Sequence, residues 1–182
     1  MTTPFEFTTM RSHYCGLVTE TLIGAEITLC GWAQRRRDHG NMIFIDLRDH
    51  EGIVQVIVKP EAGPAFSTAE TVRCEFVLYV KGSVQRRPAG TENENLSSGR
   101  IEIWVSALTI LNSAAALPFQ LEQDDVSEAV RLRYRYLDLR RNVMQRNLQL
   151  RAKIVSTLRR FLEDRKFIEI ETPILTKSTP EG

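Results

Sequence analysis

The stretch WAQRRRDHGNMIFIDLRD, residues 32–49, combines three consecutive arginines, a turn and a strand that carries a phenylalanine among its polar positions. The aliphatic side chains of this strand share one face, and Phe44 shares the other face with Asp46, so the ring is expected to be exposed. Gln55 in the next strand should point outward with Phe44. Such a combination can hold single-stranded bases, because a ring stacks a base, an amide reads its edge and guanidinium groups bind phosphate.

The orientation of the arginines depends on the regularity of their strand. Simple alternation from Ile27 would turn Arg35 and Arg37 toward the core. A β-bulge near Gly31, or the strand end at Arg37, would bring them to the outer face. The alternative for the whole cluster is that Phe44 packs in a second layer and the arginines form a solvated face. Their coincidence on adjacent strands favours binding of single-stranded nucleic acid.

These side chains need a framework of strands, and alternation of apolar and polar residues predicts five strands before about residue 112. The five segments are AEITLCGWAQRRR (25–37), NMIFIDLRD (41–49), GIVQVIVK (52–59), CEFVLYVKGSVQRR (74–87) and IEIWVSALTIL (101–111). Residues 60–73 contain a proline, a glycine and apolar residues at helical spacing, which predicts a short helix. Five strands with a helix between the third and the fourth are the element order of an OB-fold, a small Greek-key barrel. We therefore expect a mainly β fold.

The connection between the fourth and fifth strands, residues 86–100, is long and polar. Compact domains keep such a loop mostly where it has a function, and a surface loop without a role is the alternative. Small residues, a proline and acids indicate a linker from about residue 112. We accordingly assign residues 1–112 to the barrel domain, with 1–9 as an extension, and residues 113–142 to a linker or hinge.

Residues 143–182 are expected to begin a second domain. Asn142 is a candidate N-cap for a helix with an apolar face. The residues of this face are Leu150, Ile154, Leu158, Phe161 and Leu162. FIEIETPIL, residues 167–175, predicts an alternating strand with Pro173 at its edge or end. One helix and one strand cannot close a core, so we interpret the sequence as an N-terminal fragment of a longer protein.

Composition and missing motifs limit the chemistry. The 182 residues include 24 basic and 23 acidic side chains, so nucleic-acid affinity must come from a local patch. Three widely spaced cysteines are expected to be free thiols in a reducing compartment. The sequence shows no leader and no membrane span, which favours a cytoplasmic protein without a membrane partner. No nucleotide-binding loop, nucleophile elbow or metal-ligand spacing occurs, so we predict no metal site and no complete active site.

Four segments, distributed along the chain from residue 11 to residue 182, resemble the bacterial-type aspartyl-tRNA synthetases. These segments are RSHYCG (11–16), LCGWAQRRRDHGNMIFIDLRDHEGIVQV (29–56), LRYRYLDLRRNVMQRNLQLRAKIV (132–155) and FIEIETPILTKSTPEG (167–182). The resemblance implies an anticodon-binding domain at residues 10–112 and a hinge to about residue 142. The remaining residues would then be the first helix and strand of an α/β class II catalytic domain.

The resemblance also implies roles for individual residues. The family's equivalents of four residues face the anticodon loop of tRNA: Arg35, Arg37, Phe44 and Gln55. Glu181 of TPEG resembles the contact to the amino group of aspartate. FIEIETP resembles class II motif 1, whose helix and strand build the dimer interface around the equivalent of Pro173. His39 and Gly90 resemble the residues of enzymes that charge asparagine tRNA as well as aspartate tRNA.

The implied parent is a homodimeric aspartate–tRNA ligase. It would activate L-aspartate with ATP and Mg²⁺ and transfer it to tRNA(Asp), and also to tRNA(Asn). Motifs 2 and 3, which supply most of the adenylate site, are not found in the sequence. The 182-residue fragment is therefore expected to bind tRNA weakly, to hold neither ATP nor Mg²⁺ and to catalyse nothing.

Other classes of protein stay open. A stand-alone OB-fold module that binds single-stranded nucleic acid or tRNA explains residues 26–112 but not ETPILTKSTPEG. A unit that serves chiefly for dimerisation explains the tail but not the surface around Phe44. The asparagine and lysine synthetases share the architecture, but RRRDHG and LRYRYLDLRR fit the aspartyl group better.

Overall fold

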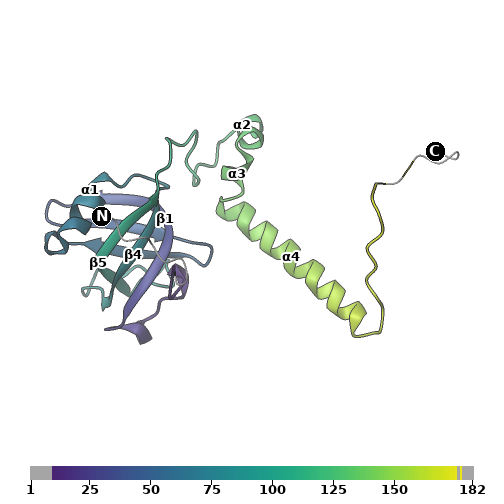
Figure 1. The fold of residues 1–182 in the computed structure, drawn as a ribbon, viewed down its shortest axis with the longest axis horizontal. Helices are drawn as coiled ribbons and strands as arrows, with labels where there is room; N and C mark the ends of the chain where they lie inside the picture. Colours follow the sequence, from purple (N-terminus) through teal and green to yellow (C-terminus); the bar gives the residue numbers. More distant parts are fainter. Residues whose placement is uncertain (1–9, 176, 178–182) are drawn as a thin grey trace. The chain divides into compact units, whose positions relative to one another are not determined.

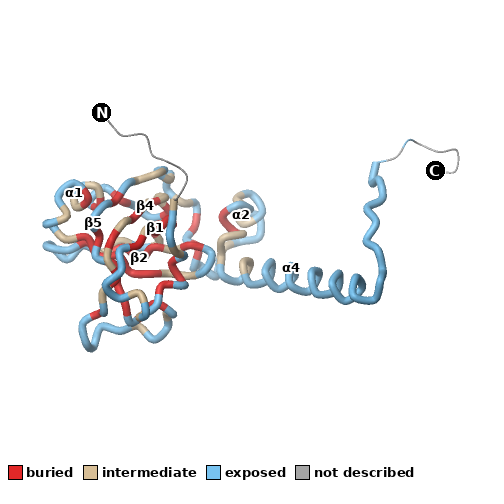
Figure 2. The backbone as a smooth tube through the Cα atoms, turned by 60° about the horizontal axis from the view of Figure 1, so that its bottom comes forward, coloured by how far each residue is buried: buried red, intermediate tan, exposed pale blue. Residues whose placement is uncertain are grey.

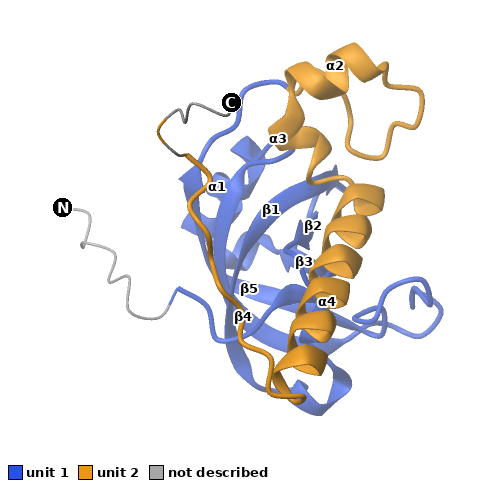
Figure 3. Cartoon of the chain, turned by 90° about the vertical axis from the view of Figure 1, so that its right-hand side faces the viewer, with its two compact units in different colours: residues 1–116 blue, residues 117–182 orange. Residues whose placement is uncertain are grey.

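The computed structural model describes residues 10–175 and residue 177. The chain forms two compact units, residues 1–116 and residues 117–182 (Figure 1, Figure 3). Each unit contains a hydrophobic cluster of its own. Within the described residues, no helix is long and apolar enough to cross a membrane.

The first unit is a closed five-stranded barrel with the neighbour order β1-β2-β3-β5-β4. The strands are β1 (Glu26–Asp38), β2 (Ile43–Arg48), β3 (Ile53–Val58), β4 (Val77–Arg86) and β5 (Ile101–Asn112). The helical segments are α1 (Pro64–Thr71), between β3 and β4, and the 3-10 helices η2 (Cys15–Leu17), η3 (Glu20–Leu22) and η4 (Pro60–Ala62). β3 and β5 run parallel, whereas β1 pairs antiparallel with both β2 and β4. The barrel confirms the predicted mainly β OB-fold.

Alternation of side chains explains why these segments close a barrel. On β2, Ile43, Ile45 and Leu47 are buried, and the residues between them are half-buried on the outer face. The interior is filled by branched aliphatic side chains from every strand, which appear as red backbone inside the barrel (Figure 2). Ala65 and Ala69 of α1 pack against the same core, so the helix covers part of it.

A β-bulge in β1 decides which arginines reach the outer surface. The register with β2 shifts between Ala33 and Arg35, so Gln34 is an additional residue on β1. Beyond the bulge, Arg35 lies opposite Asp46 of β2. Arg37, the next outward residue of β1, lies opposite Phe44. Of the two alternatives considered, a bulge near Gly31 or the strand end at Arg37, the structure has a bulge, and it lies at Gln34. The bulge turns Arg35 and Arg37 to the outer face, because one extra residue exchanges the inward and outward positions for the rest of the strand.

The second unit contains α2 (Glu128–Arg133), α3 (Arg135–Asp138) and α4 (Asn142–Glu163). Phe119, Leu121 and Leu137 form a small buried cluster under the first two helices. Part of the predicted linker therefore has a hydrophobic cluster and helices of its own.

A buried carboxylate organises the arginine-rich segment of this unit. Asp138 is fully buried, and Arg131, Arg135 and Arg141 all form ion pairs with it. Arg141 also donates from Nη2 to the main-chain oxygen of Gln123 at 2.8 Å. These arginines thus serve the local fold, since a buried carboxylate needs cationic partners.

The predicted amphipathic helix is confirmed as α4, with one correction at its start. Arg141, in an extended conformation, holds the N-cap position that was predicted for Asn142, which is the first helical residue. The apolar residues predicted for one face are all exposed, as the pale colour of α4 indicates (Figure 2). Among the described residues, nothing covers this face.

The strand predicted at residues 167–175 is not formed. These residues have no regular secondary structure, and Ile168 and Ile174 are 84% and 96% exposed. A strand needs a neighbour for its N–H and C=O groups, and the described residues supply none for this segment. Pro173 is exposed and lies in this irregular stretch, not at the edge or end of a strand.

Candidate nucleic-acid interface

A groove with a volume of about 680 Å³ lies on the outer face of β2, β3 and β5, beside the loop that follows β4. We call it the Phe44 groove. Four residues singled out from the sequence line it, namely Arg37, His39, Phe44 and Gln55. The strands bring these residues together from positions 37 to 55 because β1, β2 and β3 are sequential neighbours.

Phe44 is half-buried on the outer face of β2. The His39 and Phe44 rings form a T-shaped pair with a centroid distance of 5.2 Å and an interplanar angle of 86°. The Arg37 Cζ atom lies 5.9 Å from the centroid of the same ring. Phe44 is absent from the core cluster and from the residues packed against it. The ring is thus held by two flanking side chains while it lines the groove.

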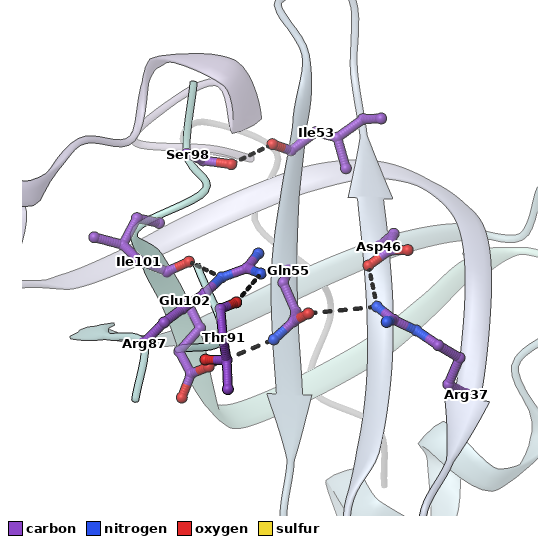
Figure 4. A network of polar contacts seen from close by, with 9 residues as sticks. All are labelled: Arg37, Asp46, Ile53, Gln55, Arg87, Thr91, Ser98, Ile101 and Glu102. Atoms are coloured by element: carbon purple, nitrogen blue, oxygen red, sulfur yellow. Dashed lines mark hydrogen bonds and ion pairs between the residues drawn. The ribbon is translucent and has the colours of Figure 1, made fainter. Parts of the chain in front are cut away.

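A chain of polar contacts crosses the floor of the groove (Figure 4). The Arg37 Nη2 group donates to Asp46 Oδ1 at 2.6 Å and to Gln55 Oε1 at 3.4 Å. The Gln55 Nε2 group donates to Glu102 Oε2 at 3.4 Å. Gln55 lines the groove on the outer face, as its parity predicts, and is only 8% exposed. Charged side chains from β1 and β5 hold its amide through hydrogen bonds.

Arg87 ties the loop after β4 to the barrel. It is buried, and its Nε group donates to the main-chain oxygen of Ile101 at 3.0 Å (Figure 4). Burial lowers the pKa of the Arg87 guanidinium, and the nearby carboxylates of Glu102 and Asp46 counteract this effect. Arg87 therefore fixes the wall of the groove and holds a positive charge close to it.

The three consecutive arginines have three different environments. Arg35 is exposed on the outer face and lies outside the groove lining. Arg36 points elsewhere: its Nε group donates to the main-chain oxygen of Ala69 at 3.0 Å, and it pairs with Asp38. Arg37 lines the groove. The bulge and the strand alternation thus divide the run into two outward arginines and one that holds α1.

Sequence reasoning missed several residues of the groove. Trp104, Glu102 and Lys59 line it, and the Trp104 Nε1 group donates to Glu102 Oε1 at 2.8 Å. The Lys59 Nζ atom lies 3.2 Å from the centroid of the indole ring. A signal was present, because the alternation of IEIWVS places Glu102 and Trp104 on the outer face, as it does Phe44.

Gly90 lies in the loop between β4 and β5, outside the groove lining, whereas Pro88 and Thr91 of the same loop line the groove. Its φ of +85° is a conformation that favours glycine, and its N–H donates to Glu92 Oε2 at 2.7 Å. The backbone conformation alone therefore explains why position 90 is a glycine, without any contact to RNA. His39, by contrast, stands at the rim in the turn between β1 and β2.

Glu181 lies outside the described residues. Within the described residues, no group of three or more His, Cys, Asp or Glu side chains could hold a metal ion. All three cysteines are free thiols, as predicted. The chemistry visible in the described part of the chain is thus recognition by rings, amides and cations.

Family models match both units. Residues 27–111 match the OB-fold nucleic acid binding domain, and residues 127–182 match the tRNA synthetases class II (D, K and N). The chain is thus similar to an OB-fold nucleic acid binding domain in its first unit and to the class II tRNA synthetases of the D, K and N group in its second. The Phe44 groove lies in the segment that matches the OB-fold domain, and α4 lies in the segment that matches the synthetases.

Solved synthetase structures share this fold. Asparaginyl-tRNA synthetase from Pyrococcus horikoshii, complexed with asparaginyl-adenylate, matches with 25% identity and a TM-score of 0.77 over 89% of this chain and 36% of that chain. Aspartyl tRNA synthetase from Entamoeba histolytica matches with 22% identity and a TM-score of 0.76 over 86% of this chain and 38% of that chain. This chain thus spans well under half the length of these neighbours.

Proposed function

We propose that this chain supplies the anticodon-binding domain and the beginning of the catalytic domain of an aspartate–tRNA ligase. The observation that carries the proposal is the Phe44 groove, where a ring, an arginine and an amide meet on the outer face of an OB-fold barrel. RRRDHG and LRYRYLDLRR support the aspartate enzyme over the asparagine and lysine enzymes by their resemblance to the aspartyl group.

The groove suits unpaired bases of an anticodon loop. A base stacks on the Phe44 ring, which its T-shaped contact with His39 holds in place. Gln55 donates one N–H to Glu102 and accepts one bond from Arg37, so its second N–H and second lone pair are left for a base edge. Arg35 and Arg37 bind the phosphates, because guanidinium groups favour bidentate contacts with phosphate oxygens.

The reaction of the full-length enzyme takes L-aspartate and ATP to aspartyl-adenylate and then to aspartyl-tRNA. Glu181 is proposed to bind the ammonium group of aspartate through a charge-assisted hydrogen bond. Mg²⁺ would neutralise polyphosphate charge during activation. The described residues offer no cluster for that ion, so its ligands are assigned to other parts of the enzyme.

We further propose that the enzyme charges both tRNA(Asp) and tRNA(Asn). The two anticodons differ at one base, so one contact at the rim of the groove can decide whether both are accepted. His39 supports the proposal because it lines the groove beside Phe44, and a neutral imidazole both donates and accepts. Gly90 supports it because a Cβ atom at this position would have no neighbouring atom within 4 Å, so this part of the loop is open.

Aminoacylation of the two purified tRNAs by the full-length enzyme tests specificity. We expect aspartate to be attached to both, with efficiencies within about tenfold of each other, a difference of about 1.4 kcal/mol. A preference of a hundredfold or more for tRNA(Asp) would contradict charging of both tRNAs. Attachment of asparagine or lysine in place of aspartate would contradict the aspartate assignment itself.

The subunit arrangement and location are part of the same proposal. The exposed apolar face of α4 supports a homodimer, because such a face is stable in water only when another surface covers it. The segment around Pro173 would join that interface. We place the enzyme in the cytoplasm, where tRNA is charged.

A further inference from the structure

Trp104 is an aromatic side chain of the Phe44 groove that the proposed contacts do not use. It lies on β5, paired in parallel register with Ile57 of β3, and is 41% exposed. Exposed tryptophan is uncommon on a barrel surface unless it serves an interface. Phe44 and Trp104 come from different strands and line one groove.

The position of the indole is fixed by the same polar chain that fixes Gln55. The Trp104 Nε1 group donates to Glu102 Oε1, and Glu102 Oε2 accepts from Gln55 Nε2. Glu102 itself is only 4% exposed, so this carboxylate acts as a rigid bridge between the ring and the amide. A ring held in this way loses little conformational entropy when a base stacks on it.

A cation covers the face of the indole. The Lys59 Nζ atom lies 3.2 Å from the ring centroid, a cation–π contact. Lysine has a flexible stem, and its ammonium binds phosphate as a point charge. An arriving nucleotide can therefore replace the ammonium with its base while its phosphate takes up the displaced charge.

We propose that Trp104 is a second stacking surface for an unpaired base of the anticodon loop, next to the base on Phe44, with Lys59 as a cover that moves to the phosphate. This proposal rests on the proposed function, because it takes RNA as the ligand. It adds a second base position and a phosphate contact to the Phe44 groove.

Fluorescence of the indole tests the proposal directly. The chain has two tryptophans, and Trp32→Phe leaves Trp104 as the sole tryptophan. Two RNAs serve as probes, an anticodon stem-loop and an unstructured oligoribonucleotide of the loop sequence. We expect saturable quenching of Trp104 by at least the stem-loop, at the concentrations where labelled RNA shows binding by anisotropy.

Substitutions separate stacking from other roles. Trp104→Leu should weaken stem-loop binding about tenfold or more, the usual effect of removing one base stack. Trp104→Phe keeps a ring but loses the bond to Glu102, and it should retain most of the affinity. Tyr14→Leu, a control at an aromatic residue that is 37% exposed outside the groove lining, should bind as wild type. Lys59→Ala should lower the salt slope by about 0.7.

The outcomes distinguish this proposal from the proposed function. Binding of the stem-loop without quenching, or unchanged affinity of Trp104→Leu, would overturn the second stacking surface and leave the anticodon-binding role intact. Quenching by the unstructured RNA without binding of the stem-loop would support stacking and contradict the anticodon-binding role. Failure of the wild-type chain to bind either RNA would overturn both.

Discussion

Phe44 and Ile45 are neighbours in the chain but lie on opposite faces of β2. Replacing Phe44 with alanine should cost about 1–3 kcal/mol of binding to an anticodon stem-loop, because a base can no longer stack there. The barrel should keep its thermal stability, since Phe44 is not part of the core cluster. Titration of labelled stem-loop and a thermal melt measure the two effects.

Ile45→Ala is the matched control for this substitution. It should lower the free energy of unfolding by about 2–5 kcal/mol, because it leaves a cavity in the barrel. Where the barrel is still folded, its RNA affinity should stay near that of wild type. If Phe44→Ala instead left affinity unchanged or lowered the melting temperature as Ile45→Ala does, Phe44 would be a packing residue.

Parity along a strand gave the correct face for Phe44 and Gln55, and applied to IEIWVS it would also have found Trp104. It could not give the burial of Gln55. That burial depends on Arg37 and Glu102, and Glu102 is distant in sequence and comes from another strand. The local sequence pattern therefore predicts which residues form the floor of the Phe44 groove. Their exposure to solvent depends on tertiary contacts, which the pattern does not give.

On β1, the three consecutive arginines Arg35, Arg36 and Arg37 can be compared directly, with Arg36 as the control. Arg35→Ala and Arg37→Ala should each weaken stem-loop binding and lower the salt slope by about 0.7 for each phosphate that the variant no longer neutralises. Arg36→Ala should leave the slope unchanged, because its guanidinium donates to Ala69 of α1 and pairs with Asp38. Binding measured across a salt series separates the three variants.

The control variant Arg36→Ala should change the stability of the barrel. Arg36→Ala should lower barrel stability by about 1 kcal/mol, the usual net contribution of one hydrogen bond. A slope change in Arg36→Ala equal to that of its neighbours would mean that the run acts as an undivided basic patch. A change of base preference in Arg37→Ala with an unaltered slope would show that Arg37 reads a base.

The exposed face of α4 yields a prediction for the full-length protein. Leu158→Glu should raise the dissociation constant of the proposed dimer at least about tenfold, because it places an unpaired charge in an apolar interface. Lys153→Glu on the same helix changes charge without removing an apolar side chain, and it serves as the control. Light scattering over a range of concentrations gives the mass. An unchanged dimer in Leu158→Glu would place the interface elsewhere.

The sequence predicted helices and strands correctly where the spacing of apolar residues alone defines them. The five strands and α4 follow from periods of two and of 3.6 residues. The position of the bulge did not follow, because Gln34 carries no signal that distinguishes it from its neighbours. The strand at residues 167–175 did not form because a strand also needs a partner, which a pattern cannot supply.

For the whole molecule, the cysteines provide a probe of barrel opening. Cys15 and Cys30 are buried, and burial raises the pKa of both thiols, so little thiolate is present at neutral pH. Cys74 is exposed. A maleimide or iodoacetamide at pH 7 to 8 should therefore modify one thiol per native chain. Mass spectrometry should show the second and third adducts only as denaturant opens the barrel. Rapid modification of all three thiols in native buffer would contradict this packing.

The near-neutral charge of the chain has a consequence for the rate of the proposed tRNA binding. With a net charge of +1, and with Arg37 already paired with Asp46, long-range attraction of tRNA is weak. Association should then proceed at about 10⁵–10⁶ M⁻¹ s⁻¹, the range for partners without strong electrostatic steering. Cognate and non-cognate tRNAs would arrive at similar rates and differ in how long they stay. Selection by this domain would be a matter of residence time, set by how quickly stacked bases leave the Phe44 groove.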